Sequence, residues 1–246
     1  LPVLEEIYRQ IDRGVSVSPS LSDGDACLAG QTIATVTGSV QSLLIGERTA
    51  LNFLQRLSGI ATCTSAFVTA VQTARESAER SAPAGQEPGA VVKARIVDTR
   101  KTTPSLRAAE KYAVRMGGGY NHRSGLYDAV LIKDNHILAA GDISSAVQLA
   151  LDGAPHTVTV TVECDTLAQV EEAVNAGADI VMLDNMPVEL LAQAVKLVDG
   201  NACVEASGRV TLESVGAIAE TGVDVISVGA LTHSAPALDI ALDLAF

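Results

Sequence analysis

The chain has 246 residues, which is long enough for a full hydrophobic core in one large domain or two smaller ones. Its 48% hydrophobic and 19% charged residues are typical of a globular protein and exclude a disordered chain. A formal net charge of -12, with only 3% aromatic residues, argues against binding to nucleic acid or to an anionic membrane.

The apolar runs and the cysteines give no sign of a membrane or secreted protein. No apolar run reaches the length of a membrane span, and no basic segment followed by an apolar one opens the chain. Cys27, Cys63, Cys164 and Cys203 form no Cys-x-x-Cys pair. We therefore expect free thiols rather than a zinc site or disulfides, and a cytoplasmic protein.

The first third of the chain predicts a small α+β unit followed by helices. Residues 1–13 have apolar residues at helical spacing, whereas residues 14–41 alternate short apolar runs with glycines, which predicts small antiparallel strands. Residues 43–80 have a helical pattern, and we expect Ser58-Gly59 to divide it into two helices. Residues 81–89 are rich in proline and glycine and predict an exposed insertion.

From residue 91 onward, short apolar runs alternate with helical patterns. Repeated strand-helix units specify a parallel sheet with helices packed against it. The predicted strands are 91–97, 129–132, 157–162, 179–183, 202–206 and 224–228. The predicted helices that follow them are 105–116, 143–151, 166–176, 188–198, 212–221 and 237–246.

Charged residues or glycine-containing turns follow all six predicted strands. An open doubly wound sheet places its ligand groups mainly near one switch point of the strand order. In a β/α barrel all the strand ends face one mouth, so groups from every strand contribute to the site. The sequence therefore predicts the α/β class, with a β/α barrel over residues 91–235.

Cations are concentrated around the first two of these strand ends. Arg100 and Lys101 follow the first strand, His122 and Arg123 precede the second, and Lys133 follows the second. Several cations around one mouth suit a small ligand with more than one carboxylate or phosphate. The alternative is a set of solvated surface charges, which is the usual role of lysine and arginine.

The later strand ends carry carboxylates and small residues. Glu163 and Asp184 follow neighbouring strands, and two carboxylates beside cations suit Mg²⁺ bound together with a polyphosphate. Helix caps or ion pairs are the alternative for these carboxylates. Ser207-Gly208 and residues 228–233 (V-G-A-L-T-H) end the last two strands, where small residues let backbone N–H groups approach a phosphate.

Eight motifs, in order along residues 43–246, resemble the quinolinate phosphoribosyltransferase family, also called nicotinate-nucleotide pyrophosphorylase (carboxylating). So many motifs in one order make the resemblance specific. They are E-R-T-A-L-N-F-L-Q-R-L-S-G-I-A-T (47–62), D-T-R-K-T-T-P (98–104), G-G-G-Y-N-H-R (117–123), L-I-K-D-N-H (131–136), V-E-C-D (162–165), M-L-D-N (182–185), E-A-S-G (205–208) and S-V-G-A-L-T-H (227–233).

The resemblance implies a fold and an assembly. The barrel would be an incomplete β/α (TIM-like) barrel, and residues 1–90 would hold a small sandwich-like α+β domain, the interdomain helices and the insertion. Residues 236–246 would form a C-terminal helix that returns towards the N-terminal domain. The N-terminal domain looks truncated relative to the family, and the family works as a homodimer or a larger assembly.

The resemblance also assigns roles to individual residues. Arg48, which spacing alone leaves as a surface residue, would reach into the active site of the partner subunit. The two carboxylates of quinolinate would be held by Arg100, His122, Arg123 and Lys133, with Lys101 nearby. Mg²⁺ and the ribose of phosphoribosyl pyrophosphate would be held by Glu163 and Asp184, which with Lys133 would be the catalytic residues. The 5′-phosphate end would be lined by Ser207, Gly208, Gly229 and His233.

Two residues depart from the family pattern, and three rival functions stay open. Arg209 stands where the family usually has a second glycine after Ser-Gly, and Thr161 stands where relatives often carry an acidic residue. The rivals are a related phosphoribosyltransferase that uses another heterocycle, a catalytically silent binding homologue, and a Schiff-base aldolase that uses Lys133.

Overall fold

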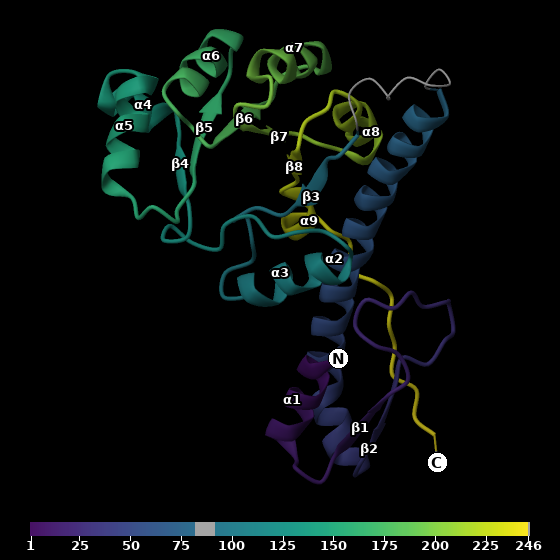
Figure 1. Cartoon of the computed structure of the whole chain (residues 1–246). Helices are drawn as coiled ribbons and strands as arrows, with labels where there is room; N and C mark the ends of the chain where they lie inside the picture. Colours follow the sequence, from purple (N-terminus) through teal and green to yellow (C-terminus); the bar gives the residue numbers. More distant parts are fainter. Residues whose placement is uncertain (82–91, 246) are drawn as a thin grey trace.

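The computed structural model describes residues 1–81 and 92–245. One long helix joins a small N-terminal unit, at the bottom of Figure 1, to a curved sheet surrounded by helices. The predicted insertion at 81–89 lies outside the described residues, apart from Ser81, which ends the long helix. Among the helices described, none combines the length and the hydrophobicity that crossing a membrane requires.

The predicted incomplete barrel is confirmed by the order of the parallel strands. In sequence order they are β3 (Arg95–Val97), β4 (Val130–Ile132), β5 (Val160–Cys164), β6 (Ile180–Asp184), β7 (Cys203–Ser207) and β8 (Val225–Ser227). Their order in the sheet is β3-β8-β7-β6-β5-β4, so the first strand pairs with the last and every other neighbour is consecutive. This is the order of a β/α barrel that is open between β3 and β4.

The barrel opening is partly filled by a loop rather than by a strand. Tyr120 forms an isolated parallel bridge with Val97 of β3. Its N–H donates to Ile96 O at 2.8 Å, and its carbonyl accepts from Asp98 N at 3.2 Å. The segment after Tyr120 therefore lies along the edge of β3, in the position that a further strand would take.

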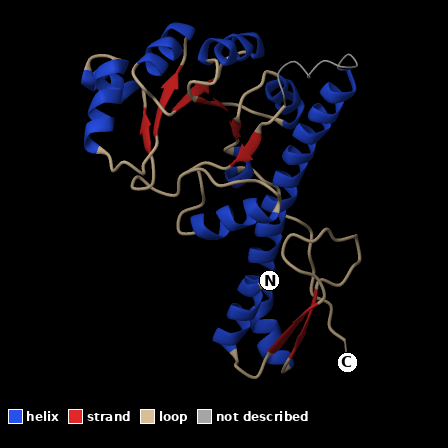
Figure 2. Cartoon of the chain, in the orientation of Figure 1, coloured by secondary structure: helices blue, strands red, loops and turns tan. Residues whose placement is uncertain are grey.

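Helices cover the outer face of the sheet, as Figure 2 shows. Most lie within a few residues of the predicted ranges, but the short helices α4 and α9 were not predicted. Side-chain oxygens of Asp142, Thr166 and Thr211 cap three of the helices. The helices are α3 (Arg107–Met116), α4 (Asp134–Ala140), α5 (Ile143–Gly153), α6 (Leu167–Asn175), α7 (Val188–Val198), α8 (Leu212–Glu220) and α9 (Ala230–His233).

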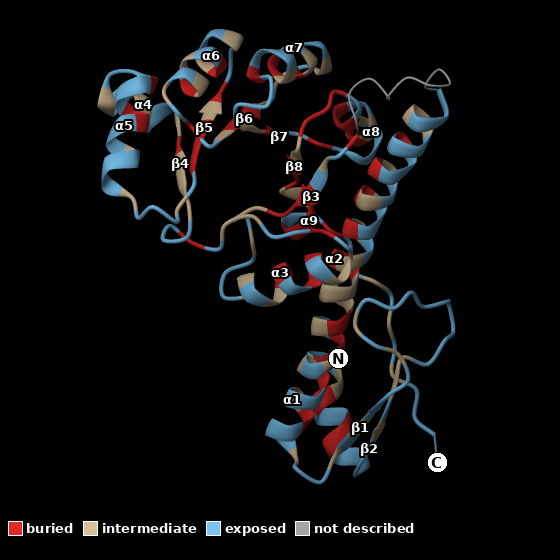
Figure 3. Ribbon diagram, in the orientation of Figure 1, coloured by how far each residue is buried: buried red, intermediate tan, exposed pale blue. Residues whose placement is uncertain are grey.

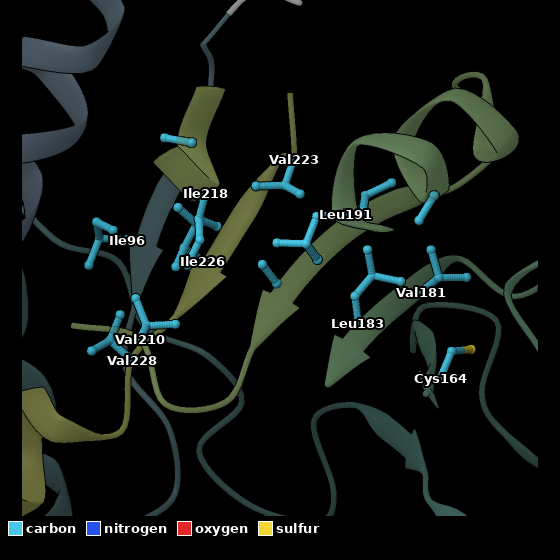
Figure 4. Close-up of a cluster of buried hydrophobic side chains, with 14 of the residues drawn as sticks. Ile96, Cys164, Val181, Leu183, Leu191, Val210, Ile218, Val223, Ile226 and Val228 are labelled. Carbon is cyan, nitrogen blue, oxygen red and sulfur yellow. The ribbon is translucent and has the colours of Figure 1, made fainter. Parts of the chain in front are cut away.

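The main hydrophobic core lies between the sheet and these helices. In β6, Val181 and Leu183 are fully buried and point towards Leu191 of α7 (Figure 4). Buried residues predominate in the central strands β5, β6 and β7, whereas β3 and β4 at the two edges include exposed or half-buried residues (Figure 3). Alternate strand residues point the other way, into the barrel, where the polar side chains are found. The four cysteines are free thiols, as predicted, and burial raises the pKa of Cys164 to about 12.

The predicted break at Ser58-Gly59 is wrong, because α2 is one helix that spans Val40–Ser81. Instead of ending a helix, Gly59 allows another segment of the chain to approach the backbone of α2 closely. A Cβ atom at Gly59 would lie 2.0 Å from the carbonyl oxygen of Pro236, so the C-terminal segment crosses α2 at a position without a side chain. The resulting continuous helix connects the N-terminal unit to the barrel.

The predicted C-terminal helix is also wrong, although the return towards the N-terminal domain is observed. No helix is assigned after α9 up to residue 245, where the description ends. The backbone N–H of Leu238 donates to Gln55 O at 2.9 Å, and Gln55 Nε2 donates to Ile240 O at 2.7 Å. Hydrogen bonds to α2 thus replace those that a C-terminal helix would form, and this tertiary contact overrides the helical pattern.

The N-terminal unit has its own small core. It consists of α1 (Pro2–Ile11), an antiparallel pair of strands β1 (Ser16–Pro19) and β2 (Ala34–Thr37), and the beginning of α2. Leu4 and Tyr8 of α1 pack against Leu43 and Leu54 of α2, and Ile240 of the C-terminal segment joins them. This confirms the small α+β unit, since a two-stranded sheet needs helices to cover its face.

The crossing at Gly59 predicts a specific effect on stability. Alanine favours a helix by about 1 kcal/mol over glycine, but at position 59 its methyl group would displace Pro236 from α2. We expect Gly59→Ala to lower the free energy of unfolding by about 1–3 kcal/mol, as overpacking usually does. Gly216→Ala in α8 is the matched control, because the nearest atom to its Cβ is 3.8 Å away. If Gly59→Ala unfolded at the same denaturant concentration as the parent or at a higher one, as we expect for Gly216→Ala, the close approach would be contradicted.

Candidate active site

The carboxyl ends of the six strands bring most of the predicted site residues to one edge of the barrel. Going around the sheet from β3 to β4, the groups at these ends are Arg100 and Lys101, then Gly229 and His233, then Ser207 and Gly208, then Asp184, Glu163 and Lys133. The loop with His122 and Arg123 enters from the open side, between β3 and β4. The predicted mouth is therefore made by all six strands and one loop.

Two guanidinium groups, those of Arg100 and Arg123, lie near each other at this mouth, and neither forms an ion pair in the described part of the chain. Burial lowers the pKa of Arg123, and the positive charge of Arg100 lowers it further, while the carboxylate of Asp128 offsets part of this effect. The Nε–H of Arg100 is buried and has no hydrogen-bond partner within the described chain. Arg123 donates one hydrogen bond through Nη1 to Ala129 O at 3.1 Å. A buried, unpaired donor beside a repelling cation would be stabilised by a bound anion.

A buried ion pair fixes the loop that carries Arg123. Asp98, at the end of β3, is fully buried and forms an ion pair with Lys111 of α3. The carboxylate of Asp98 also accepts from Asn121 Nδ2 at 2.6 Å and from the backbone N–H of His122 at 2.9 Å. Lys111 Nζ in turn donates to His122 O at 2.8 Å. The position of the loop thus depends on one carboxylate and one ammonium group.

The ring of His122 reaches across the barrel to a buried glutamate. His122 Nε2 lies 3.4 Å from Glu205 Oε2 on β7, and the two side chains are 16% and 3% exposed. The other ring nitrogen, Nδ1, accepts the backbone N–H of Arg123 at 2.7 Å. Glu205 points into the barrel because its neighbours Val204 and Ala206 belong to the outer core. The two side chains form a polar floor below the mouth.

Lys133 and Glu163 form an ion pair on the adjoining strands. Leu131 of β4 is paired with Thr161 of β5, so two residues further on Lys133 and Glu163 lie side by side on the inner face. Lys133 Nζ bonds to Glu163 Oε2, with 45% of the lysine side chain and 17% of the glutamate side chain exposed. The lysine side chain is therefore partly open to solvent and can contact a charged ligand.

Asp184 and the Ser207-Gly208 turn are joined by Asn185. Asn185 Nδ2 donates to Asp184 Oδ2 at 2.6 Å, and Asn185 N–H donates to Ser207 O at 2.9 Å. A Cβ atom on Gly208 would lie 2.4 Å from Asn185 Oδ1, so only glycine fits there. Arg209 is exposed and has a φ of 48°, in the left-handed region that favours glycine. Its backbone keeps the conformation that the family's usual glycine would allow.

Lys101, Gly229 and His233 come together at the end of β8. A Cβ atom on Gly229 would lie 3.2 Å from His233 Nε2 and 3.3 Å from Lys101 Cδ. The hydroxyl of Thr232 donates to Lys101 O at 2.8 Å, which ties the two segments together. Two basic side chains beside a bare backbone make a small cradle that suits a phosphate.

A second buried ion pair supports this cradle from α2. Arg56 Nη2 lies 3.0 Å from Oε1 of Glu110, which is fully buried. Arg56 also donates to Thr232 O and, at 3.1 Å, to Ala235 O. Glu110 accepts both the N–H and the hydroxyl of Thr103. The pair therefore connects the loop after β3 with the segment after β8.

Arg48 is the one predicted site residue that lies away from this mouth. It is exposed near the beginning of α2, at the end of the helix that packs against α1. Arg56, which already contacts the barrel, is eight residues further along, or about 12 Å at 1.5 Å per residue. In Figure 1 the start of α2 lies at the N-terminal unit, far from β4, β5 and β6.

Sequence reasoning missed the residues that hold the site from behind. Lys111, Glu110 and Arg56 lie on helices, where charged residues are usually solvated, and Glu205 lies inside the barrel. The presence of a glutamate within the apolar run of β7 was the only available indication. Among the described residues, no cluster of three or more His, Cys, Asp or Glu side chains could hold a metal ion. Any cation would rest on the two carboxylates together with ligand oxygens.

The fold and the site define a class of protein: an incomplete β/α barrel with cations, carboxylates and glycine turns around one mouth. The family model "Quinolinate phosphoribosyl transferase, C-terminal domain" matches residues 60–243, and the model of the N-terminal domain of the same family matches residues 1–58. The chain belongs to the quinolinate phosphoribosyltransferase family.

Named relatives and solved structures agree with this membership. A probable nicotinate-nucleotide pyrophosphorylase [carboxylating] of Bacillus subtilis is 45% identical over 98% of this chain and 78% of its own length. Quinolinate phosphoribosyltransferase [decarboxylating] 1b of Nicotiana tabacum is 41% identical over 99% of this chain and 69% of its own length. The crystal structure of NadC from Streptococcus pyogenes matches with a TM-score of 0.85 and 43% identity, over 97% of this chain and 78% of that one.

The buried Asp98–Lys111 pair predicts a large stability effect. Lys111→Met keeps the length of the side chain but leaves a buried carboxylate without its cation, which typically costs about 3 kcal/mol or more. The control is Lys93→Met, which removes the exposed partner of Asp224, with side chains 56% and 28% exposed. That change should alter the free energy of unfolding by less than about 1 kcal/mol. Equal effects of the two substitutions in chemical denaturation would refute the structural role of Lys111.

Proposed function

We propose that the chain transfers the phosphoribosyl group of phosphoribosyl pyrophosphate to quinolinate. The products are nicotinate mononucleotide, pyrophosphate and carbon dioxide, a step of de novo NAD biosynthesis. The names of the relatives state this activity. One observation in this chain gives the proposal its strongest support. Arg100 and Arg123 repel each other at the mouth, with the Arg100 Nε–H buried and unpaired among the described residues. A planar dicarboxylate would satisfy both guanidinium groups.

The dicarboxylate pocket of this proposal lies at the barrel opening, between the ends of β3 and β4. Arg100 and Arg123 would each bind a carboxylate of quinolinate, and Lys133, at the other side of the opening, would complete the pocket. Lys133 is paired with Glu163 but is 45% exposed on its side chain, so it can turn towards a second anion. Lys101 would add positive electrostatic potential to the pocket. His122 would help to position the pocket residues.

The phosphoribosyl pyrophosphate would occupy the remaining strand ends. Glu163 and Asp184 would hold Mg²⁺ together with the ribose hydroxyls, a donor set that fits a cation whose other ligands are phosphate oxygens and water. Bound there, Mg²⁺ would neutralise charge on the pyrophosphate leaving group. The bare backbone at Gly208 and Gly229 would receive the 5′-phosphate, beside Ser207 and His233.

The chemistry then follows from position and charge. The quinolinate nitrogen forms a bond to the anomeric carbon, while the bond to pyrophosphate breaks and its electron pair leaves with the pyrophosphate. The carboxylates of Glu163 and Asp184 would offset the positive charge that develops on the ribose. The bond from the ring to the 2-carboxylate then breaks, carbon dioxide leaves, and the electron pair at C2 takes a proton. No covalent bond to the protein is needed.

The rival functions receive less support. A Schiff-base lysine needs a desolvated, apolar setting, whereas Lys133 is partly exposed and paired with Glu163. A related transferase whose heterocycle lacks a second carboxylate would not need a second guanidinium group. A silent homologue would keep the pocket but lack turnover, so only activity separates it from the enzyme. The free thiols of all four cysteines support a reducing compartment, and we extend the proposal to the cytoplasm.

We further propose that the active form is a homodimer. Val40, Leu44 and Ile45 are exposed apolar residues next to Arg48 on α2. A second exposed apolar group, Leu126, Tyr127 and Leu138, lies on the loop before β4 and on α4. In a two-fold dimer, the first group of one subunit can cover the second group of the other, and the reverse contact forms by symmetry. Arg48 would then enter the partner's mouth.

Turnover of labelled quinolinate tests the proposed activity directly. The protein would be incubated with quinolinate labelled in the 2-carboxylate, phosphoribosyl pyrophosphate and Mg²⁺. We expect labelled carbon dioxide and nicotinate mononucleotide in equal amounts, with neither product when any one component is omitted. Tight quinolinate binding without product would identify a silent homologue, and no binding at all would overturn the proposal.

Removing either cation of the dicarboxylate pocket should weaken quinolinate binding. Loss of a charge-assisted hydrogen bond to a carboxylate costs about 1.5–3 kcal/mol, so Arg123→Ala and Lys133→Ala should raise the quinolinate Kd at least about tenfold. Lys196→Ala, which removes an exposed cation from α7, is the control for net charge. Calorimetric Kd values for Arg123→Ala and Lys133→Ala that match the control would exclude this pocket.

Mixed dimers should reveal which subunit uses Arg48. Arg48→Ala and Lys133→Ala should each be nearly inactive alone. If Arg48 acts in the partner's site, a hybrid dimer has one site with both residues intact. Random assortment gives about half hybrids, so activity should recover to roughly a quarter of the parent's. Absence of recovery, with subunit exchange verified by differently tagged chains, would mean that Arg48 acts within its own subunit.

A further inference from the structure

Glu205 is a buried carboxylate that forms few stabilising contacts within the fold. It lies on β7, paired with Met182 and Val225, and the residue is 2% exposed. Oε2 lies at ion-pair distance, 3.4 Å, from His122 Nε2, and Oε1 has no hydrogen-bond partner in the described part of the chain. Burying a charge this poorly paired opposes folding. A purely structural position would favour an apolar residue, so the carboxylate points to a role in the site.

The hydrogen bonds of His122 show what Glu205 can do. Nδ1 accepts the backbone N–H of Arg123 at 2.7 Å, so this nitrogen carries no proton. The ring proton is therefore on Nε2, which faces Glu205. The backbone N–H of His122 donates to Asp98 at 2.9 Å, and its carbonyl accepts from Lys111 at 2.8 Å. Both ring nitrogens and both backbone polar groups of His122 therefore face other groups of the protein.

Arg123 receives its position from this arrangement. Its backbone N–H is held by the His122 ring, and its guanidinium group by Ala129 O at 3.1 Å. The ring can accept from Arg123 only while Nδ1 is unprotonated. A carboxylate beside Nε2 favours that tautomer, because it attracts the ring proton to the opposite side. Losing this acceptor would free the ring to rotate and would release the Arg123 amide.

We propose that Glu205 is a positioning residue, which acts through the His122 ring to hold Arg123 in place for a dicarboxylate ligand. The inference rests on the proposed function for the identity of that ligand. It also changes the expected role of His122, which then supports Arg123 from behind instead of binding the carboxylate itself. Glu205 would act on quinolinate affinity and would leave the phosphoribosyl pyrophosphate end of the mouth unaffected.

Two substitutions at position 205 separate positioning from stability. Glu205→Leu keeps the approximate volume but removes the acceptor, and we expect a quinolinate Kd at least tenfold higher with the phosphoribosyl pyrophosphate Kd within twofold of the parent. Glu205→Gln keeps an oxygen that can accept from Nε2–H and should restore most of the affinity. Kd values of all three proteins within twofold, or equal losses for both ligands, would overturn the inference.

A double substitution tests whether the effect passes through His122. In a His122→Phe background, Glu205→Leu should change the quinolinate Kd by less than twofold, because the connection is already broken. If Glu205→Leu raised the quinolinate Kd by the same factor in the His122→Phe background as in the parent, the proposed route through His122 would be contradicted. A parent that fails to bind quinolinate would instead reject the proposed function, which distinguishes the two failures.

The tautomer of His122 can be measured in the parent protein without any ligand. This test therefore does not depend on whether the Glu205→Leu variant folds. The chain has four histidines, so the ¹⁵N signals of His122 can be assigned by their loss in His122→Phe. At neutral pH we expect a long-range ¹H–¹⁵N spectrum with protonated Nε2 and unprotonated Nδ1 in the parent. A proton on Nδ1 would overturn the inference whatever the binding data show.

Discussion

The barrel is open between β3 and β4, and the arrangement of the site depends on that opening. A closed sheet would fill this position with another strand and its outward helix. Here the loop after Tyr120 occupies the edge of β3 and brings Arg123 towards Arg100. Since the loop has no ladder of its own beyond Tyr120, buried Asp98 and its partner Lys111 hold it. The ion pair performs the positioning that a seventh strand would otherwise provide.

The interior of this barrel is polar where most β/α barrels are filled with apolar side chains. Glu205 and His122 meet inside it, and the Lys133–Glu163 pair lies nearer the mouth. Such groups contribute little to stability once their desolvation is counted. The stability comes from the opposite face of the strands, where Val181, Leu183 and their neighbours pack against helices. The two faces of one short strand therefore serve different purposes, which residue alternation makes possible.

Much of this organisation could be predicted from the sequence, because local patterns specify it. The strand-helix repeat gave the parallel sheet, and charged residues after strands such as β3 and β6 located the mouth. Contacts between distant segments could not be predicted in this way. Gly59 resembles a helix break until Pro236 is seen against it, and the apolar period after residue 236 resembles a helix until its backbone bonds to Gln55.

The supporting residues of the site were missed for a related reason. A charged residue on a helix, such as Lys111 or Arg56, is usually solvated, and only the fold shows that these two reach buried carboxylates. Arg48 is the opposite case. Its exposed position carries no indication of function within one subunit, and its proposed role comes from the family resemblance together with the apolar residues beside it.

The central claim is that the Arg100–Arg123 pair is built for a ligand with two carboxylates. Calorimetry with quinolinate and with nicotinate, which has one carboxylate fewer, tests it most directly. Removing one charge-assisted contact costs about 1.5–3 kcal/mol, so quinolinate should bind at least about tenfold more tightly than nicotinate. Equal Kd values for the two ligands would show that the second guanidinium group is not paired by the ligand, and would contradict the account.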